Sequence, residues 1–146
     1  MGIIEDLKGN RICIDTAPFI YFIEKNSKYF RLIKSIFSEI ENEKIDAVTS
    51  TITLLEVLVL PLKLGKIELS KQYRDILLYT DGLSTCEVSH DISELGANLR
   101  AKYLIRTPDS IQLATGIIHG AKDFITNDIS LKKVKEIGII VLDDYT

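Results

Sequence analysis

The sequence predicts an α/β fold in which a central parallel sheet of about five strands carries helices on both faces. Short runs of apolar and β-branched residues alternate with longer stretches of helical spacing, the order expected for strands joined by crossover helices. A hydrophobic fraction of 46% and a charged fraction of 27% are typical of a globular protein with a substantial core. No linker-like tract, repeat or low-complexity segment divides the 146 residues, so we expect one domain over residues 1–146.

The expected strands are short and the expected helices fill the stretches between them. A β-like pattern is found at residues 11–14, 46–49, 85–88, 124–126 and 139–142. Helical periodicity is found at residues 18–24, 30–41, 53–64, 70–83, 92–104, 108–119 and 130–136. Because strands in such an order lie parallel, their carboxyl ends meet at one edge of the sheet, where α/β proteins bind ligands.

Three aspartates are expected at that edge. Asp15 directly follows the first strand, and Asp128 follows the fourth. Asp109 lies in a first helical turn that Thr107 is expected to cap, with Pro108 at the first position. Each aspartate by itself is equally well explained as a cap or a first-turn residue that suits the helix dipole.

Glu56 is harder to explain as a surface residue. It lies in the segment TSTITLLEVLVLPLKLG, where Ser50 or Thr51 is expected to cap a helix that is otherwise almost wholly apolar. A helix that is hydrophobic on all sides is expected to be buried, and a charge within it needs a metal ion or a partner such as lysine.

Taken together, the four acids predict a cation site. Like charges brought into one crevice raise one another's pKa and destabilise the fold unless a cation lies among them. An all-oxygen set without histidine suits Mg²⁺ or Mn²⁺ rather than zinc. Such ions activate water and neutralise charge on phosphate groups, so phosphoryl chemistry is the expected activity.

Four segments in order resemble the PIN-domain nucleases, most closely the VapC-type toxin ribonucleases. They are IDTAPFIYFIE, TSTITLLEVLVLPL, LRAKYLIRTPDSIQLATG and DFITNDISL, and the likeness extends over about residues 14–131. Each segment alone is weakly specific, whereas the ordered set is a strong signal. The resemblance implies a single PIN-like domain and Mg²⁺- or Mn²⁺-dependent endonucleolytic cleavage of RNA.

The resemblance also assigns roles to individual residues. Asp15, Glu56 and Asp109 match acids that hold the first metal ion, and Asp128 matches one that supports a second ion or orients the attacking water. Thr126 matches a hydroxyl residue that helps to orient these acids. The implied reaction is in-line hydrolysis of a phosphodiester bond.

Three positions depart from the family pattern without removing a carboxylate. Ala17 stands where many relatives carry Asn, Gln112 where many carry His, and Gly116 where Ala is usual. These departures bear on substrate details more than on metal binding. Ala17 also argues against a haloacid-dehalogenase-type phosphatase, which needs a second aspartate two residues after the first.

Basic residues near the site are candidates for RNA contacts. The formal charge of −3 becomes +1 when the four acids are set aside as metal-bound. The candidates are Arg100, Lys102, Arg106 and Lys132, followed by Lys133 and Lys135. They could bind phosphates in a salt-sensitive way, and the alternative is an ordinary solvated helix face.

The expected setting is cytoplasmic, with protein partners. Cys13 and Cys86 lack metal-like spacing and are interpreted as reduced core thiols, and no apolar run is long enough to span a membrane. The toxin resemblance implies a small antitoxin and a homodimer. A patch of Ile20, Ile23 and residues 30–40 is a candidate contact surface, and its alternative is burial in the core.

Two other interpretations stay open at this point. The chain could be a non-catalytic PIN-like module whose acids bind a structural ion or a basic protein. It could also be an RNA-processing PIN nuclease unrelated to toxin–antitoxin function. Metal-dependent RNA cleavage separates the first from an enzyme, and a short neighbouring gene with a DNA-binding pattern favours the toxin over the second.

Overall fold

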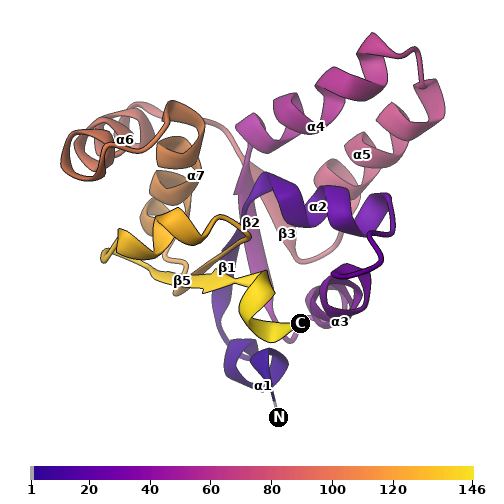
Figure 1. Cartoon of the computed structure of the whole chain (residues 1–146), viewed down its shortest axis with the longest axis horizontal. Coiled ribbons are helices and arrows are strands. Elements are labelled where there is room, and N and C mark those ends of the chain that lie inside the picture. Colours follow the sequence, from indigo (N-terminus) through magenta and orange to yellow (C-terminus); the bar gives the residue numbers. More distant parts are fainter. Residues whose placement is uncertain (1) are drawn as a thin grey trace.

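The computed structural model describes residues 2–146 and contains a five-stranded parallel sheet in the order β3-β2-β1-β4-β5. This confirms the predicted fold class (Figure 1). The strands are β1 (Arg11–Ile14), β2 (Asp46–Ser50), β3 (Leu83–Cys86), β4 (Asp123–Thr126) and β5 (Gly138–Val141).

Strand β3 lies two residues earlier than the sequence indicates. Its pairing with β2 aligns Leu83 with Ala47 and Cys86 with Ser50. The turn before it requires Gly82, whose φ is 85° and where a Cβ would come within 2.5 Å of the Ile40 carbonyl oxygen. This tight turn, rather than hydrophobicity, sets where the strand begins.

Seven α-helices and two 3₁₀ helices are found in residues 2–146. The α-helices are α1 (Ile3–Leu7), α2 (Thr16–Ile23), α3 (Phe30–Glu41), α4 (Thr51–Lys63), α5 (Ile67–Tyr79), α6 (His90–Tyr103) and α7 (Thr107–Ile118). The 3₁₀ helices are η1 (Ile129–Lys133) and η2 (Leu142–Tyr145). The prediction of an α-helix at residues 130–136 is therefore wrong, because this segment forms η1. Helix α1 was not predicted. Helix α5 ends at Tyr79 rather than at residue 83, and residues 80–82 form the turn into β3.

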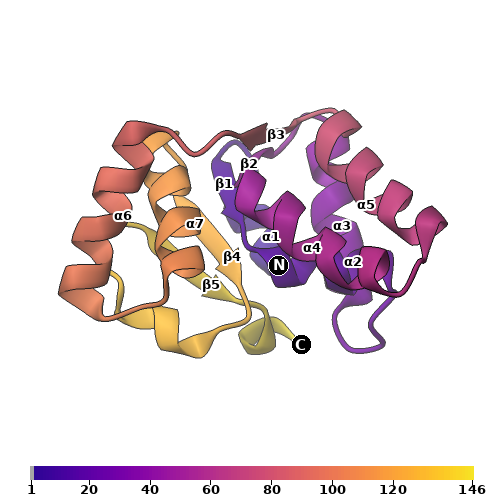
Figure 2. The same ribbon diagram turned by 90° about the horizontal axis from the view of Figure 1, so that it is seen from above.

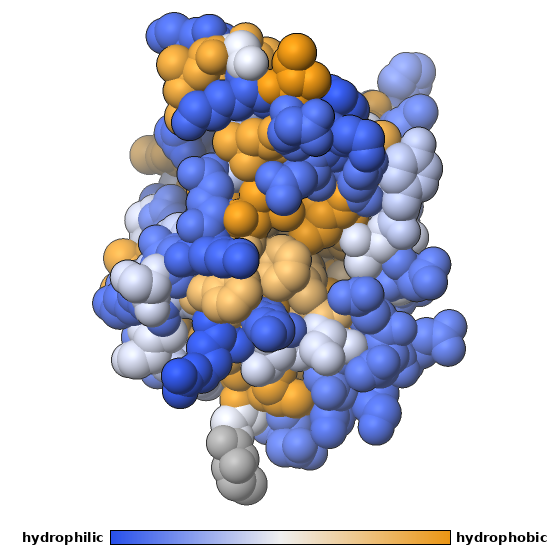
Figure 3. All heavy atoms as spheres, turned by 90° about the vertical axis from the view of Figure 1, so that its right-hand side faces the viewer, coloured by the Kyte–Doolittle hydropathy of each residue, from blue (hydrophilic) through white to orange (hydrophobic). Residues whose placement is uncertain are grey.

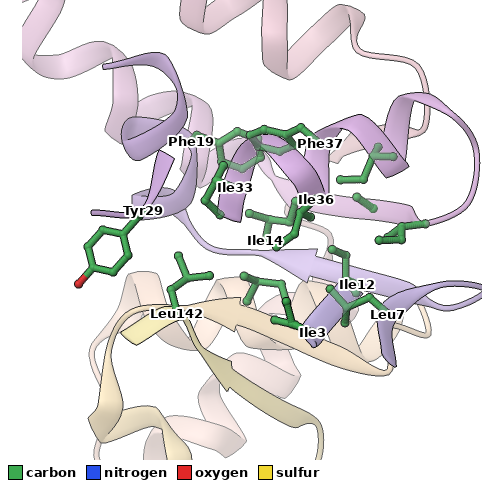
Figure 4. Packing of buried hydrophobic residues seen from close by; sticks show 14 of the residues in the cluster. Ile3, Leu7, Ile12, Ile14, Phe19, Tyr29, Ile33, Ile36, Phe37 and Leu142 are labelled. Atoms are coloured by element: carbon green, nitrogen blue, oxygen red, sulfur yellow. The ribbon is translucent and has the colours of Figure 1, made fainter. Parts of the chain in front are cut away.

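Alternate residues of the central strands enter two separate cores. Ile12 and Ile14 of β1 pack with Phe19, and Cys13 packs on the opposite face with Leu113. Figure 4 shows the first core between the sheet and α2 and α3. Figures 1 and 2 show α6 and α7 on one side of the sheet and α2, α3 and α5 on the other. Burial on both faces explains why the central strand β1 has three successive apolar residues, Ile12, Cys13 and Ile14.

Helix α4 is not buried on all sides, which corrects the prediction made for it. Val57 and Pro61 are buried, whereas Leu55 is 60% and Leu60 58% exposed. The reason is that α4 and α5 form a hairpin whose far end projects from the sheet (Figure 1). Figure 3 faces this end and shows apolar side chains at its top.

The stripe on α3 belongs to the core, as the alternative interpretation expected. Ile33, Ile36, Phe37 and Ile40 are all buried. Ile20 and Ile23 of α2 are partly buried against the same core. Among the described residues, no helix is both long enough and apolar enough to cross a bilayer.

Candidate active site

All four predicted acids line one pocket of about 560 Å³, which we call the acidic pocket. Asp15 follows β1, Glu56 lies on α4 after β2, Asp109 is in the first turn of α7, and Asp128 follows β4. The remaining lining residues are Thr16, Ala17, Ile20, Tyr21, Arg106, Thr126, Asn127 and Ile129. Because β1 pairs with both β2 and β4, the chain brings these distant segments to one sheet edge.

Asp15 is both the N-cap of α2 and a wall of the pocket. Its Oδ1 accepts a hydrogen bond from the backbone N–H of Thr16 at 2.8 Å, and Thr126 Oγ1 donates to its Oδ2 at 2.7 Å. The pKa of Asp15 is raised to about 6, chiefly by burial and to a smaller extent by the Asp109 and Glu56 carboxylates. The hydrogen bonds from Thr126 and Thr16 act in the opposite direction and partly offset this rise in pKa. This carboxylate therefore lies in a desolvated, negatively charged setting.

Glu56 takes its hydrogen bond from a hydroxyl group rather than from a lysine. Thr16 Oγ1 donates to Glu56 Oε1 at 2.5 Å, and the side chain is partly buried at the pocket wall. Ser50 is the N-cap of α4, with its Oγ accepting from the Ile52 N–H at 3.1 Å. The helix start is therefore fixed by the end of β2, one and a half turns before Glu56.

Gln112 organises the polar groups beneath Glu56. Its Nε2 donates to Thr53 Oγ1 at 2.5 Å and to Thr16 Oγ1 at 3.2 Å, and its Oε1 accepts from Ser50 Oγ at 2.8 Å. The side chain is 1% exposed. Gln112 therefore acts from inside the protein, where it cannot touch a substrate, and links α7 to Glu56 through Thr16.

Asp109 is paired with Arg106, a basic side chain that lines the pocket. Arg106 Nε donates to Oδ2 at 3.2 Å, and Nη2 donates to Oδ1 at 3.5 Å. Arg106, not Thr107, is the N-cap residue of α7. The Thr107 hydroxyl instead accepts from Arg100 Nη1 at 3.0 Å, so the predicted cap is displaced by one residue.

Asp128 and Thr126 join the last strand of the site to the first. Thr126 is fully buried, and its Oγ1 accepts from the Asp128 N–H at 3.1 Å while it donates to Asp15. Asp128 Oδ1 accepts from the Ser130 N–H at 2.9 Å and from its hydroxyl at 2.7 Å, so Asp128 caps η1. The backbone that carries Asp128 is therefore fixed relative to Asp15.

The donor set suits a hard divalent cation because it consists of carboxylate and hydroxyl oxygens. Among the residues that the structure describes, no histidine or cysteine lines the acidic pocket. Within residues 2–146, however, no three acidic, histidine or cysteine side chains come close enough to hold an ion between them. Asp109 is paired with the Arg106 guanidinium group, so an ion that binds among the acids through Asp109 competes with Arg106 for that carboxylate.

The predicted RNA-contacting residues have different surroundings. Arg106 lines the pocket, whereas Arg100 Nε donates to the Ile105 carbonyl at 2.8 Å and so fixes the turn between α6 and α7. Lys102 pairs with Glu136 at 3.1 Å, and Lys132 pairs with Asp144 at 2.6 Å. Their role in RNA binding stays a prediction.

Sequence reasoning missed the polar residues that position the acids. Ser50 was considered only as a possible helix cap and Gln112 only as a departure from a family pattern, while Thr16 and Thr53 were given no role. The spacing of Asp109 and Gln112, three residues apart on one helix, was the available signal, since such residues share a face.

Comparison with known proteins agrees with this fold. The family model described as PIN domain matches residues 12–137, and no curated protein matches the chain. VapBC2 from Rickettsia felis, bound to a promoter DNA fragment, is 19% identical with a TM-score of 0.70, covering 90% of this chain and 98% of the other. A toxin–antitoxin complex from Klebsiella pneumoniae is 23% identical with a TM-score of 0.67, covering 90% and 97%.

A third solved structure also has this fold. Mycobacterium tuberculosis VapC20, a toxin that cleaves the sarcin-ricin loop, is 16% identical with a TM-score of 0.64. The match covers 77% of this chain and 86% of that one. At these identities the likeness extends to the fold alone.

Proposed function

Because the chain belongs to the PIN domain family, we propose that it is a Mg²⁺- or Mn²⁺-dependent endoribonuclease and the toxin of a type II toxin–antitoxin pair. One observation carries the proposal. Four carboxylates from four separate segments line one pocket at the carboxyl edge of a parallel sheet. Solved structures of VapC-containing toxin–antitoxin complexes share this fold.

In this proposal Asp15, Glu56 and Asp109 hold a divalent ion, and Asp128 supports a second ion or orients the attacking water. When bound, the ion supplies an activated water and neutralises charge on the scissile phosphate. Thr126 and Thr16 keep the oxygens of Asp15 and Glu56 directed into the pocket. A buried layer centred on Gln112 holds this arrangement rigid during the reaction.

The direct test is cleavage of a broad panel of single-stranded and structured RNAs in Mn²⁺. We expect the wild-type chain to cleave at least one RNA, EDTA to stop the reaction, and Asp15→Asn to lower the rate at least about 100-fold. Asp75→Asn is the matched control, because Asp75 lies on α5 and pairs with Lys71 away from the acidic pocket.

If the wild type and Asp15→Asn leave every RNA equally intact, the nuclease proposal is wrong and a binding module becomes the better account. A loss of cleavage in Asp75→Asn as large as that in Asp15→Asn would also contradict the assignment of the site.

The proposed partner is a small antitoxin that covers the exposed apolar face of α4. Leu55, Val59, Leu60 and Leu62 are each more than half exposed, which is unusual for leucine and valine in a single-chain protein. Coexpression with the product of a short adjacent gene should give a stable complex with suppressed RNA cleavage. A second copy of this chain is the other occupant proposed for this face. Sedimentation of the isolated chain distinguishes the two, because it shows whether the chain alone is a monomer or a dimer.

A further inference from the structure

Arg106 occupies an unusual position for a cation. It is the N-cap residue of α7, the positive end of the helix dipole, where a positive charge is unfavourable. Nevertheless its guanidinium group turns toward the helix and donates to both carboxylate oxygens of Asp109. The neighbouring acids therefore outweigh the dipole in setting this orientation.

The guanidinium group also experiences the other acids of the pocket. The pKa of Arg106 is raised first by Asp109 and then, over a longer range, by Glu56 and Asp128. The Arg106 side chain is 75% exposed, whereas that of Asp109 is 11% exposed. The pair thus consists of a largely buried carboxylate and a largely exposed cation, and the cation can turn into solvent without disturbing the core.

We propose that Arg106 is a built-in counter-ion of the acidic pocket, which a divalent cation must displace from Asp109 in order to bind. The inference rests on the proposed metal site and deepens it. Both Asp109 oxygens accept a hydrogen bond from Arg106, so an ion that coordinates Asp109 competes with the guanidinium group for the same carboxylate. Electrostatic repulsion between the guanidinium group and a dication also weakens metal binding while Arg106 remains at Asp109.

Two consequences follow from this competition. Arg106 lowers the affinity of the pocket for metal, and it stabilises the metal-free pocket by offsetting the repulsion among its acids. Once displaced, the guanidinium group lies at the pocket mouth, where its planar donors are free to bind an RNA phosphate. Arginine commonly binds phosphate through two parallel hydrogen bonds.

The test is isothermal titration of Mn²⁺ into the full chain, without RNA, after removal of metal with EDTA. We expect Arg106→Gln to bind Mn²⁺ about fivefold more tightly than the wild type at low salt, as for loss of an exposed ion pair. The gain should shrink at high salt, because screening weakens the competing pair. Arg106→Lys, which keeps the charge but cannot bridge both oxygens, should fall between the two.

Arg31→Gln is the matched control, since it removes an identical charge from the exposed surface of α3. Its Mn²⁺ affinity should stay within about twofold of the wild type. A second readout is the melting temperature in EDTA, which should fall in Arg106→Gln, while the rise on adding Mn²⁺ should be larger than in the wild type.

The outcomes separate this inference from the proposed function. If the wild type binds Mn²⁺ and Arg106→Gln binds it equally or more weakly, the counter-ion role is overturned and the metal site stands. If the wild type binds no Mn²⁺, both are overturned. Tighter binding in Arg106→Gln but not in Arg31→Gln supports both.

Discussion

Asp15 shows how one residue serves two purposes that seemed to be alternatives. It caps α2 through one oxygen and faces the acidic pocket with a carboxylate that Thr126 orients. The sequence could not decide between a cap and a site residue, because both require an acid at a strand end. In the structure Asp15 both caps α2 and lines the acidic pocket, and Asp128 likewise caps η1 and lines this pocket.

The metal-free protein should become more stable when Asp15 loses its charge. The pKa of Asp15 is raised to about 6, above the value of about 3.9 for an unfolded chain. Its contribution to stability is therefore complete below about pH 4 and is lost as the pH rises through about 6. Asp15→Asn should raise the free energy of unfolding at pH 7.5 by up to about 3 kcal/mol, at about 1.4 kcal/mol per pKa unit.

Urea denaturation in EDTA at pH 4 and at pH 7.5 measures this effect. Asparagine can still accept from the Thr16 N–H, so the cap is retained, while the hydrogen bond that Asp15 Oδ2 accepts from Thr126 Oγ1 is lost at both pH values. The gain should nearly vanish at pH 4. An equal or lower stability of Asp15→Asn at pH 7.5 would show that the carboxylate is not electrostatically strained.

Gln112 is the residue whose importance the sequence understated. Gln112→Leu keeps the approximate size of the side chain but leaves Ser50, Thr53 and Thr16 without a shared partner in a buried layer. We expect a loss of about 2–4 kcal/mol in the free energy of unfolding. Mn²⁺ binding should also weaken, because Thr16 would no longer be held against Glu56. Gln72→Leu, on the exposed surface of α5, is the control and should change neither quantity appreciably.

At the scale of elements, the packing of α7 on β1 explains one departure from the family pattern. A Cβ at Gly116 would lie 2.8 Å from the Cys13 Cβ and 3.1 Å from Ile137 Cδ1. Glycine therefore lets this helix approach the strand that carries Asp15 more closely than alanine would. The departure concerns packing behind the site, and no contact with a substrate is needed to account for it.

Gly116→Ala should destabilise the protein despite the better helix propensity of alanine. We expect overpacking to cost about 1–3 kcal/mol, measured by urea denaturation. Gly96→Ala on α6 is the control, since its Cβ would meet nothing closer than Ser110 Oγ at 3.4 Å. It should be neutral or stabilising by up to about 1 kcal/mol. Equal changes in the free energy of unfolding for Gly116→Ala and Gly96→Ala would contradict the prediction.

Elements with strong periodicity were predictable and weakly patterned ones were not. The bounds of β1 and α3 agree with the sequence analysis because each has a clear apolar pattern and a distinct end. The bounds of β3 were shifted because its sequence, LSTC, has little apolar character and its position depends on pairing with β2. The exposure of α4 could not be predicted, because an apolar helix does not reveal which of its faces has a neighbour.

At the scale of the whole molecule, strand order decides which residues meet. With β1 between β2 and β4, the segments after all three strands converge at one sheet edge. Asp109 lies on α7, which follows α6 rather than a strand, so strand order alone does not account for its place. Asp15, Glu56 and Asp128 were predictable from the alternation of strands and helices. Their hydrogen-bond partners were not, because Thr16, Gln112 and Arg106 acquire their roles only from side-chain positions in the folded chain.

The central claim is that carboxylates from these separate segments jointly bind a divalent cation. The most direct measurement is the anomalous X-ray signal of Mn²⁺ in crystals of the metal-loaded protein. The account predicts a peak in the acidic pocket at coordination distance, about 2.0–2.3 Å, from oxygens of Asp15, Glu56 and Asp109, with Arg106 moved away from Asp109. Saturating Mn²⁺ that gives no peak in this pocket, or a peak bound by none of these three carboxylates, would contradict it.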